Sequence, residues 1–224
     1  MTKKILVKGP VLSRSGYGEQ ARFAVEALRS REDLFDIYLM NIPWGNTGQV
    51  TDPKVRGWIE EAIFKTVGYI QSGGQFDMSL QVTIPNEFEK IAPVNIGYTA
   101  GIETTKVAPE WIDKCNTTVD RVVVVSDHSR KVFETTKYEI QDNNGNKVPN
   151  WGMKVPVKSV NYSVRDAETE DLDITFETDK NFLVVSQWGP RKNVDNTIRW
   201  FVEQFQDDSD TGLVLKTNIV AVLN

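Results

Sequence analysis

The sequence predicts an α/β protein built on a parallel sheet with helices on both faces. Short apolar runs that resemble strands alternate with amphipathic helical segments from residue 4 to residue 137. A loop rich in glycine, serine and proline follows the first of these runs, at residues 9–18, and the alternation starts again near residue 180. This pattern is typical of a parallel sheet wrapped by helices. We therefore expect one such α/β domain, followed by the first βαβ unit of a second.

Strands are expected where short runs are rich in apolar and β-branched residues. These runs lie at residues 5–7, 35–41, 76–82, 94–98, 122–125 and 157–162. The run at 122–125 consists of four valines, so we expect that strand to be covered on both faces.

Helices are expected where apolar residues recur every three or four positions. These segments cover residues 19–30, 53–72, 109–116 and 126–137. Asp52 followed by Pro53 is a signal for the start of a helix, and Gly73 with Gly74 should end that helix. Ser126 is the expected cap of the last segment.

The pattern breaks at residues 138–156, where two polar arms flank the sequence NNGN at 143–146. Such a sequence predicts a tight turn, so we interpret this segment as a hairpin insertion in a first domain of residues 1–164. Residues 165–178 are acidic and have few large apolar side chains, as in an interdomain linker. Residues 179–224 are then the incomplete start of a second domain.

Composition limits the class of protein. The 224-residue chain has a net charge of −5 and no long basic block, which argues against a nucleic-acid partner. Its one cysteine, Cys115, excludes an intrachain disulfide and fits a reducing compartment. The first residues contain no apolar segment of signal-peptide length, and no run of about 18 apolar residues occurs in the sequence. We therefore expect a cytoplasmic protein without a membrane span.

The glycine-rich loop is the first candidate for binding. Gly16, Gly18 and Ala21 match the dinucleotide fingerprint G-x-G-x-x-A, and Tyr17 lies between the glycines. The glycines follow the strand about one turn too late for that fingerprint, and no acidic residue ends the second strand to hold a ribose. A loop that faces some other ligand is the preferred interpretation. A loop that only turns the chain, and a nicotinamide site, are the alternatives.

A second candidate follows the fourth expected strand, where Glu103, Thr104 and Thr105 lie among small residues. A carboxylate there could bind sugar hydroxyls, or orient or deprotonate a nucleophile. The alternatives are a carboxylate that caps the helix starting at Pro109 and one that is simply solvated. The only histidine, His128, is more typical of a capping or surface residue than of a catalyst. Because it has no His or Cys partners, no metal site is expected.

The third candidate is cationic. Arg191 and Lys192 follow a strand at 182–185 and a Gly-Pro turn, and a helix with an apolar side comes next. Lys216 ends the strand after that helix, at 212–217. Arginine offers a planar fork and lysine a compact charge, both suited to phosphate oxygens. An anion site is preferred here over a solvated surface pair.

Other residues carry less weight. Asp171 and Asp173 have the spacing of a metal–diphosphate motif, but no strand leads into them, so we discount them. Trp44, in the loop after the second strand, could stack on a sugar.

The chain resembles nucleotide-sugar-dependent glycosyltransferases of the GT-B type, in the retaining family-four (glycosyltransferase group 1) branch. The resemblance is carried by the glycine loop at 9–21, by YTAGIETTKVAPEW at 98–111 with DRVVVVS at 120–126, and by VVSQWGPRKN at 184–193 with LVLK at 213–216. It implies two Rossmann-like domains, the first for an acceptor and the second for the sugar nucleotide.

By this resemblance, Arg191 and Lys192 would bind the donor diphosphate and stabilise it as it leaves. Glu103 falls in a loop that often supplies a histidine next to the transferred sugar in relatives. Gly16 and Gly18 would border the acceptor and the diphosphate. The family also carries a later Glu-containing motif that the 224 residues do not include, so we expect either a fragment or a natural truncation.

Two hypotheses follow from the sequence. The first is transfer of a sugar from a nucleoside-diphosphate sugar to an acceptor hydroxyl with retention, with no metal and no resident cofactor. The second is a non-catalytic, glycosyltransferase-like binding or scaffold module, which could self-associate through its incomplete second domain.

Overall fold

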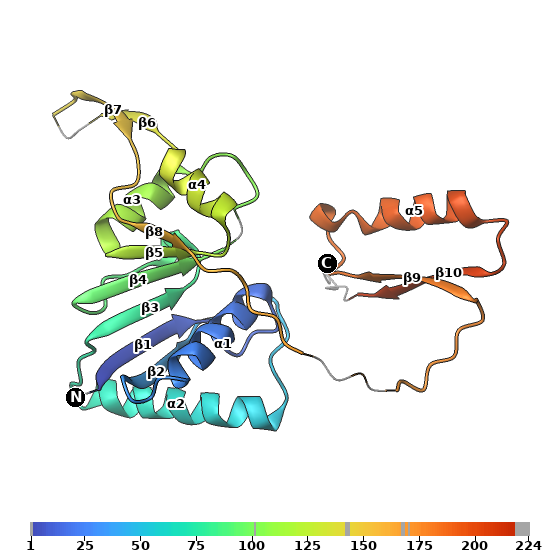
Figure 1. The fold of residues 1–224 in the computed structure, drawn as a ribbon, viewed down its shortest axis with the longest axis horizontal. Coiled ribbons are helices and arrows are strands. Elements are labelled where there is room, and N and C mark those ends of the chain that lie inside the picture. The colour runs from blue at the N-terminus through green and yellow to red at the C-terminus, as the bar shows by residue number, and fades with distance from the viewer. Residues whose placement is uncertain (1, 101, 142–143, 167–168, 170, 218–224) are drawn as a thin grey trace, which may run out of the picture. The chain divides into compact units, whose positions relative to one another are not determined.

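The computed structural model describes residues 2–100, 102–141, 144–166, 169 and 171–217 (Figure 1). The chain divides into two compact units, unit 1 with residues 1–164 and unit 2 with residues 165–224. Asn143, in the turn of the predicted hairpin, and residues 218–224, in the predicted second domain, lie outside the described residues.

Unit 1 contains a six-stranded parallel sheet in the order β2-β1-β3-β4-β5-β8 (Figure 1). Its strands are β1 (Lys3–Gly9), β2 (Phe35–Asn41), β3 (Met78–Val82), β4 (Val94–Thr99), β5 (Arg121–Val124) and β8 (Val157–Ser159). After β1 the chain places β2 on one side and β3 on the other, so the strand order reverses between β1 and β3. This reversal is the topological switch point of Rossmann-like sheets, where ligands usually bind.

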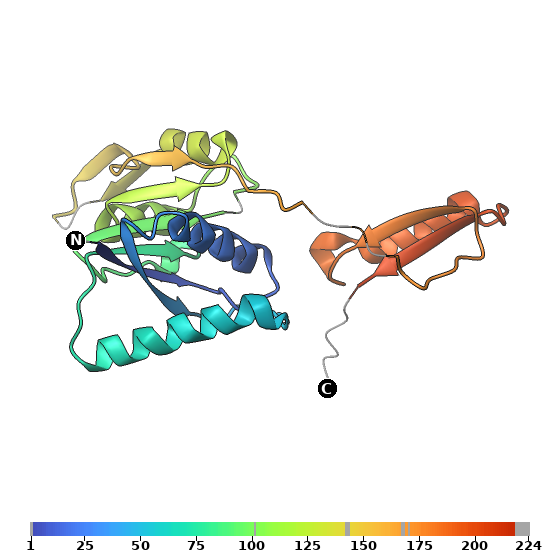
Figure 2. The same cartoon turned by 60° about the horizontal axis from the view of Figure 1, so that its bottom comes forward.

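Helices cover both faces of the sheet (Figures 1 and 2). They are α1 (Gly16–Arg29), α2 (Pro53–Gln71), α3 (Pro109–Thr118) and α4 (Asp127–Thr135), with a short 3₁₀ turn η1 (Pro85–Glu87). Tyr98 of β4 packs on the buried cluster that contains side chains of α1 and α2. The preceding residue, Gly97, pairs with Val122 of β5, which belongs to the buried cluster that contains side chains of α3 and α4 (the α3–α4 cluster). Consecutive strand residues point to opposite faces, so the predicted α/β fold with helices on both faces is confirmed.

One detail of that prediction is wrong. Val122 and Val124 are buried, but Val123 and Val125 are only half-buried, so β5 is fully covered on one face only. The reason is that α3 and α4 cover that face, while α1 and α2 lie mainly against β1, β2 and β3 on the other. The strand expected at 157–162 also ends earlier, at Ser159.

The edge of the sheet at β2 is covered by α2. The backbone N–H of Leu39 donates to Thr66 Oγ1 at 2.8 Å, and Lys65 Nζ donates to the carbonyl of Ile37 at 3.1 Å. Outward-facing backbone groups of an edge strand otherwise invite pairing with another chain. The helix therefore both packs on the sheet and satisfies part of its edge.

The expected helix signals act as predicted in two helices. Asp52 caps α2 by accepting from the N–H of Lys54, and the helix ends before Gly73, which has a positive φ of 77°. Ser126 caps α4 by accepting from the N–H of Ser129. By contrast α1 begins at Gly16, three residues before the predicted start, because Ser15 is its cap and accepts from the N–H of Gly18.

The predicted hairpin is formed by β6 (Tyr138–Gln141) and β7 (Lys147–Trp151), which are antiparallel. Gly145, in its turn, has a positive φ of 81°, a conformation that favours glycine. The hairpin was expected to lie apart from the core, but Tyr138 and Trp151 pack against the α3–α4 cluster. Its base is therefore part of the core of unit 1.

Unit 2 is a βαβ unit with two parallel strands. They are β9 (Lys180–Val185) and β10 (Thr211–Lys216), joined through η2 (Pro190–Lys192) and α5 (Val194–Phe205). The α5 helix packs through Phe201 and Phe205 on Phe182 of β9, with ring centroids 5.9 and 5.4 Å from that of Phe182. The neighbouring β9 side chains Leu183 and Val185 are 65% and 63% exposed, so the described residues of unit 2 leave the other face of this sheet uncovered.

Gly97 is the position in the sheet where a side chain is least tolerable. A Cβ at this residue would lie 2.3 Å from the ring of the fully buried Phe88. Overpacking of this kind costs about 1–3 kcal/mol, so we predict that Gly97→Ala lowers the free energy of unfolding by that amount. Urea unfolding followed by tryptophan fluorescence measures the effect.

The matched control is Gly57→Ala in α2, where nothing lies within 4 Å of the new Cβ. It should be neutral or stabilise by up to about 1 kcal/mol, and equal effects of the two changes would contradict the proposed clash with Phe88.

Candidate functional site

The candidate site of unit 1 lies at the carboxyl edge of its sheet. Loops 10–15, 42–52 and 100–108 follow β1, β2 and β4 at that edge. Because the strands are parallel, these loops all emerge on one side of the sheet, next to the switch point.

Tyr17 joins two of these loops. Its Oη lies 3.0 Å from Thr99 Oγ1 and 3.1 Å from both the N and the O of Ala100, at the end of β4. Its ring packs on Trp44 with centroids 4.4 Å apart and planes tilted by 40°. Burial raises the pKa of Tyr17, although hydrogen bonds from Thr99 and Ala100 act in the opposite direction. The phenol is therefore a neutral, fixed side chain that positions Trp44.

A cluster of hydroxyl groups holds the loops after β1 and β2 together. Ser13 Oγ lies 2.8 Å from Ser15 Oγ and 2.6 Å from Thr47 Oγ1, and Thr47 donates to the carbonyl of Trp44 at 2.9 Å. A Cβ on Gly18 would lie 2.0 Å from the carbonyl oxygen of Ser13. The absence of a side chain at Gly18 thus lets the loop cross the first turn of α1.

The predicted binding glycines lie in a different element from the one expected. Gly16 and Gly18 belong to the first turn of α1 and not to the loop before it. Gly16 is exposed, and a Cβ added to it would meet no atom within 4 Å, whereas Gly18 is buried. Of the two, only Gly16 leaves open space for a ligand at the start of the helix.

The loop after β4 presents Glu103, Thr104 and Thr105, all exposed; Gly101 is outside the described residues. His128, in the first turn of α4, places Nε2 3.2 Å from the carbonyl oxygen of Thr104. The residue at the cap position of α3 is Ala108 and not Glu103. The structure therefore assigns His128 a contact that ties the Glu103 loop to α4.

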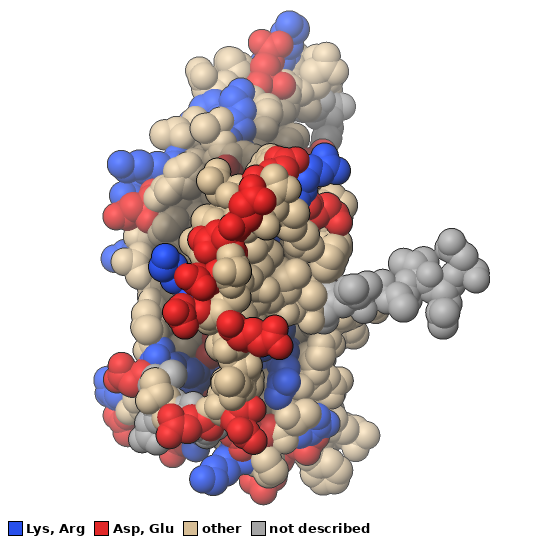
Figure 3. All heavy atoms as spheres, turned by 90° about the vertical axis from the view of Figure 1, so that its right-hand side faces the viewer, with Lys and Arg blue, Asp and Glu red and all other residues tan. Residues whose placement is uncertain are grey.

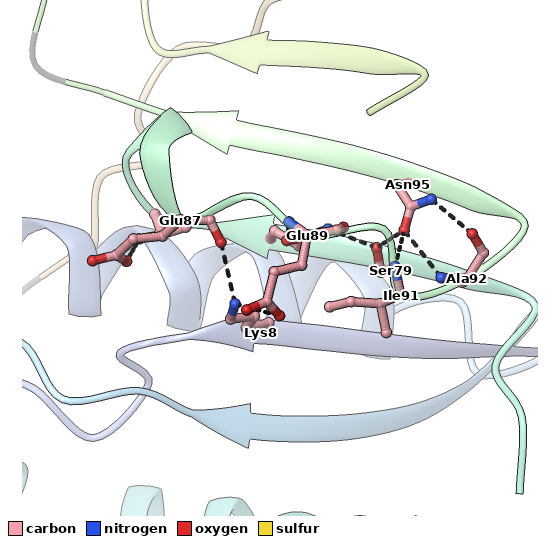
Figure 4. A network of polar contacts seen from close by, with 9 residues as sticks. Lys8, Ser79, Glu87, Glu89, Ile91, Ala92 and Asn95 are labelled. Atoms are coloured by element: carbon pink, nitrogen blue, oxygen red, sulfur yellow. Dashed lines mark hydrogen bonds and ion pairs between the residues drawn. The ribbon is translucent and has the colours of Figure 1, made fainter. Parts of the chain in front are cut away.

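A buried polar network, which was not predicted from the sequence, lies beside the switch point (Figure 4). Lys8, at the end of β1, is almost fully buried, and its Nζ lies 2.9 Å from Glu89 Oε2 and donates to the carbonyl of Glu87 at 3.2 Å. Farther along the sheet, Ser79 donates to Asn95 Oδ1 at 2.8 Å. These bonds fix the segment after β3 against the sheet. The sequence pattern only weakly indicates these hydrogen bonds, because the buried polar residues of β1 and β3 alternate with apolar residues that are typical of any buried strand.

The cations of unit 2 lie at one end of its sheet. Lys216 is the last residue of β10 and pairs with Val185 at the end of β9, and its carbonyl accepts from Ser186 N at 3.1 Å. Arg191 and Lys192 form η2 between that end of β9 and α5, and all three cations are exposed. Asn193, the next residue, adopts a left-handed conformation with φ of 53° and starts α5 without a side-chain cap.

The opposite end of unit 2 is acidic. The connection from α5 to β10 contains Asp207, Asp208 and Asp210, and Asp179 precedes β9. Figure 3 shows a band of acidic side chains on the side of the molecule where this connection lies. Carboxylates therefore outnumber Lys180 at the amino end of these strands, and cations outnumber Asp195 at the carboxyl end.

A small pocket of about 140 Å³ lies at the carboxyl edge of unit 1, between the loops after β1 and β2. Trp44, Asn41, Thr47 and Gln49 are among its lining residues. A larger hollow of about 520 Å³ lies at the other end of β2, where Arg29 and Lys65 are paired with carboxylates. We favour the smaller pocket as the functional one because it lies at the switch-point edge.

Neither a metal site nor a membrane span is formed by the described part of the chain. Within the described ranges, no group of three or more His, Cys, Asp or Glu side chains is arranged to hold a metal ion. A membrane span would need a longer and more apolar helix than any that the described residues form.

No model of a known protein family matches the chain, and no curated protein matches it with significant similarity. Function is therefore inferred from the chemistry of the two candidate sites.

Cys115 is the only thiol and is buried in the α3–α4 cluster. Burial raises its pKa to about 12, and only the thiolate reacts with disulfide reagents. We predict that the native protein reacts with Ellman's reagent at pH 8 at least a hundred-fold more slowly than the protein in guanidinium chloride. Absorbance at a fixed reagent concentration measures both rates. Rapid reaction of the folded protein would show that Cys115 is accessible and would reopen it as a candidate nucleophile.

Proposed function

We propose that this protein takes part in glycosyl transfer from a nucleoside-diphosphate sugar, with unit 2 binding the diphosphate and unit 1 binding the acceptor. The proposal combines the resemblance of the sequence to GT-B enzymes with the Rossmann-like sheet of unit 1. The single observation that carries it is the placement of Arg191, Lys192 and Lys216 at the carboxyl end of β9 and β10.

The chemistry of that end suits a diphosphate. The first amide groups of α5 have no partner within the helix, and the helix dipole places partial positive charge there. Asn193 provides no side-chain cap. Arg191 and Lys192 precede this turn directly, so cations lie next to the free amides in the chain, a combination that phosphate sites use. The acidic opposite end, with Asp207 and Asp208, would repel the same ligand.

The proposed reaction needs charge stabilisation more than it needs acid–base groups. When the bond between the sugar and the diphosphate breaks, negative charge builds up on the leaving phosphate oxygens. Fixed cations and helix amides stabilise that charge without reorganising during the step. In this proposal Arg191 and Lys192 supply this stabilisation, and Lys216 contributes to binding of the donor.

On the acceptor side, the proposal uses the loops at the carboxyl edge of unit 1. Glu103 is an exposed carboxylate on a loop tied to α4 through His128 and Thr104. Such a carboxylate could orient an acceptor hydroxyl or accept its proton. Tyr17, Thr104 and Thr105 are the neighbouring groups that could hold the acceptor.

The diphosphate site can be tested by nucleotide binding to the full chain. We predict that a nucleoside diphosphate, from a panel of UDP, GDP, ADP and dTDP, binds at low salt. Arg191→Ala, Lys192→Ala and Lys216→Ala should each weaken this binding by about tenfold, as expected for loss of one charge-assisted contact. Isothermal titration calorimetry at two salt concentrations measures the effect.

Lys180→Ala is the matched control, because Lys180 is an exposed lysine of the same unit at the opposite, amino end of β9. It should leave nucleotide affinity within about twofold of the parent protein. If no member of the panel binds, or if Lys180→Ala weakens binding as much as the other variants, the proposed diphosphate site is wrong.

A second candidate function, a non-catalytic module that self-associates, is favoured by the uncovered face of β9. Leu183 and Val185 are 65% and 63% exposed there, and contiguous exposed apolar surface often marks an interface. If this face pairs two copies, light scattering should give a dimer mass that Leu183→Glu with Val185→Glu converts to a monomer. A concentration-independent monomer mass for the unmodified chain would exclude this candidate.

A further inference from the structure

We infer that the pocket between the loops after β1 and β2 is a subsite for one neutral sugar residue, with Trp44 as its stacking surface. The inference deepens the proposed function by giving the acceptor a chemical class, and only its assignment as acceptor rests on that proposal. Sugar binding itself is argued from the pocket.

The aromatic side of the pocket is fixed before any ligand binds. Trp44 is half-buried, and its indole is supported by the ring of Tyr17 at 4.4 Å. Tyr17 is in turn held to β4 by contacts to Thr99 and Ala100 at 3.0–3.1 Å. Large, fixed aromatic side chains give binding surface at a small cost in conformational entropy. The C–H face of a pyranose ring is a suitable partner for such a surface.

The polar side of the pocket offers hydrogen-bond donors in a fixed orientation. Asn41 Oδ1 accepts from the N–H of Leu12 at 3.1 Å, and Gln49 Oε1 accepts from Arg56 at 3.3 Å. Each of these contacts fixes which way the amide points, because the oxygen must face the donor. Neither side-chain NH₂ group has a hydrogen-bond partner among the described residues, and both residues line the pocket.

Hydroxyl groups complete this side. Ser13 and Thr47 also line the pocket, and their oxygens lie 2.6 Å apart. Their hydrogens are engaged with Ser15 and with the carbonyl of Trp44, so these oxygens can accept hydrogen bonds from sugar hydroxyls. Together with the two amides they match a ligand with several hydroxyls around one ring.

The charge and the size of the pocket narrow the class of ligand. None of the nine described residues that line it is charged. Arg14, which lies in the adjoining loop, is bonded to Thr51 at 2.8 Å. A phosphate group would therefore find no counter-charge in the lining. A volume of about 140 Å³ is below the roughly 300–1,000 Å³ of pockets that take drug-sized ligands, so the pocket suits a ligand no larger than about one ring.

The test uses the full chain labelled with 5-fluorotryptophan and observed by fluorine NMR. The chain contains six tryptophans, and the spectrum of Trp44→Phe assigns the resonance of Trp44. Methyl glycosides of glucose, galactose, mannose and N-acetylglucosamine are titrated to tens of millimolar. We expect the Trp44 resonance to shift saturably with at least one glycoside, while the other five stay in place.

Variants measured by ligand-observed saturation transfer complete the test. Trp44→Ala should weaken binding of that glycoside at least tenfold, and Asn41→Ala and Gln49→Ala should weaken it several-fold. Trp200→Ala is the matched control, because Trp200 is an exposed tryptophan of unit 2, 59% exposed on α5. It should change nothing. Unshifted resonances of the remaining tryptophans in each variant confirm that the chain has folded.

Three outcomes would overturn the inference. They are no saturable shift with any glycoside, a glycoside affinity unchanged by Trp44→Ala, and tighter binding of the 6-phosphate of the sugar than of the neutral sugar. Failure of the proposed glycosyl transfer is a separate result. If nucleoside diphosphates do not bind but the glycoside does, the result supports the sugar subsite and contradicts the proposed glycosyl transfer.

Discussion

The contact between Tyr17 and the end of β4 is the interaction on which the candidate site of unit 1 depends. It joins the first turn of α1 to Thr99 and Ala100 across the switch point of the sheet. Loops alone are the most mobile parts of α/β domains, so a binding surface at this edge needs such a tie. Tyr17 also supports Trp44, so one side chain sets both the position of the helix start and the aromatic wall of the pocket.

Glycines and hydroxyl groups make this arrangement possible around Tyr17. Gly18 has no side chain that could collide with the carbonyl of Ser13, and Ser15 caps the helix that carries Tyr17. Ser13 then contacts Thr47 in the loop after β2. Loops from β1, β2 and β4 are therefore connected by a few short contacts, each of which orients the next.

The sequence was sufficient to predict the fold because most of its signals are local. Asp52 before Pro53, Ser126 and the apolar periodicities each act within a few residues, and the structure forms helices and strands at the places they indicate. The errors arose where tertiary packing decides. Val123 is half-buried because α1 and α2 lie mainly against β1, β2 and β3 on that face, and Tyr138 joins the core because the base of the hairpin packs against the α3–α4 cluster. Neither the half-burial of Val123 nor the packing of Tyr138 can be predicted from the local sequence pattern.

The candidate site could be predicted only in part. Tyr17 and the cations Arg191 and Lys192 were candidates by residue type and by their position after strands, whereas Trp44 was given little weight. The roles of Asn41 and Gln49 could not be found in the same way, because they depend on donors 29 and 7 residues away in the chain, Leu12 and Arg56. The same holds for Lys8, whose buried charge is satisfied by Glu89 from another strand connection.

The two units separate the two kinds of recognition that glycosyl transfer would require. The pocket of unit 1 has an aromatic wall and an uncharged lining, whereas the carboxyl end of unit 2 gathers Arg191, Lys192 and Lys216. A diphosphate is held mainly by charge, so its binding should weaken with salt. A neutral sugar is held by stacking and hydrogen bonds, which salt affects little. In this proposal each ligand draws on different side chains in a different unit, so substitutions should remove either affinity without the other. The assignment of each site can therefore be tested through its own contacts, independently of the other site.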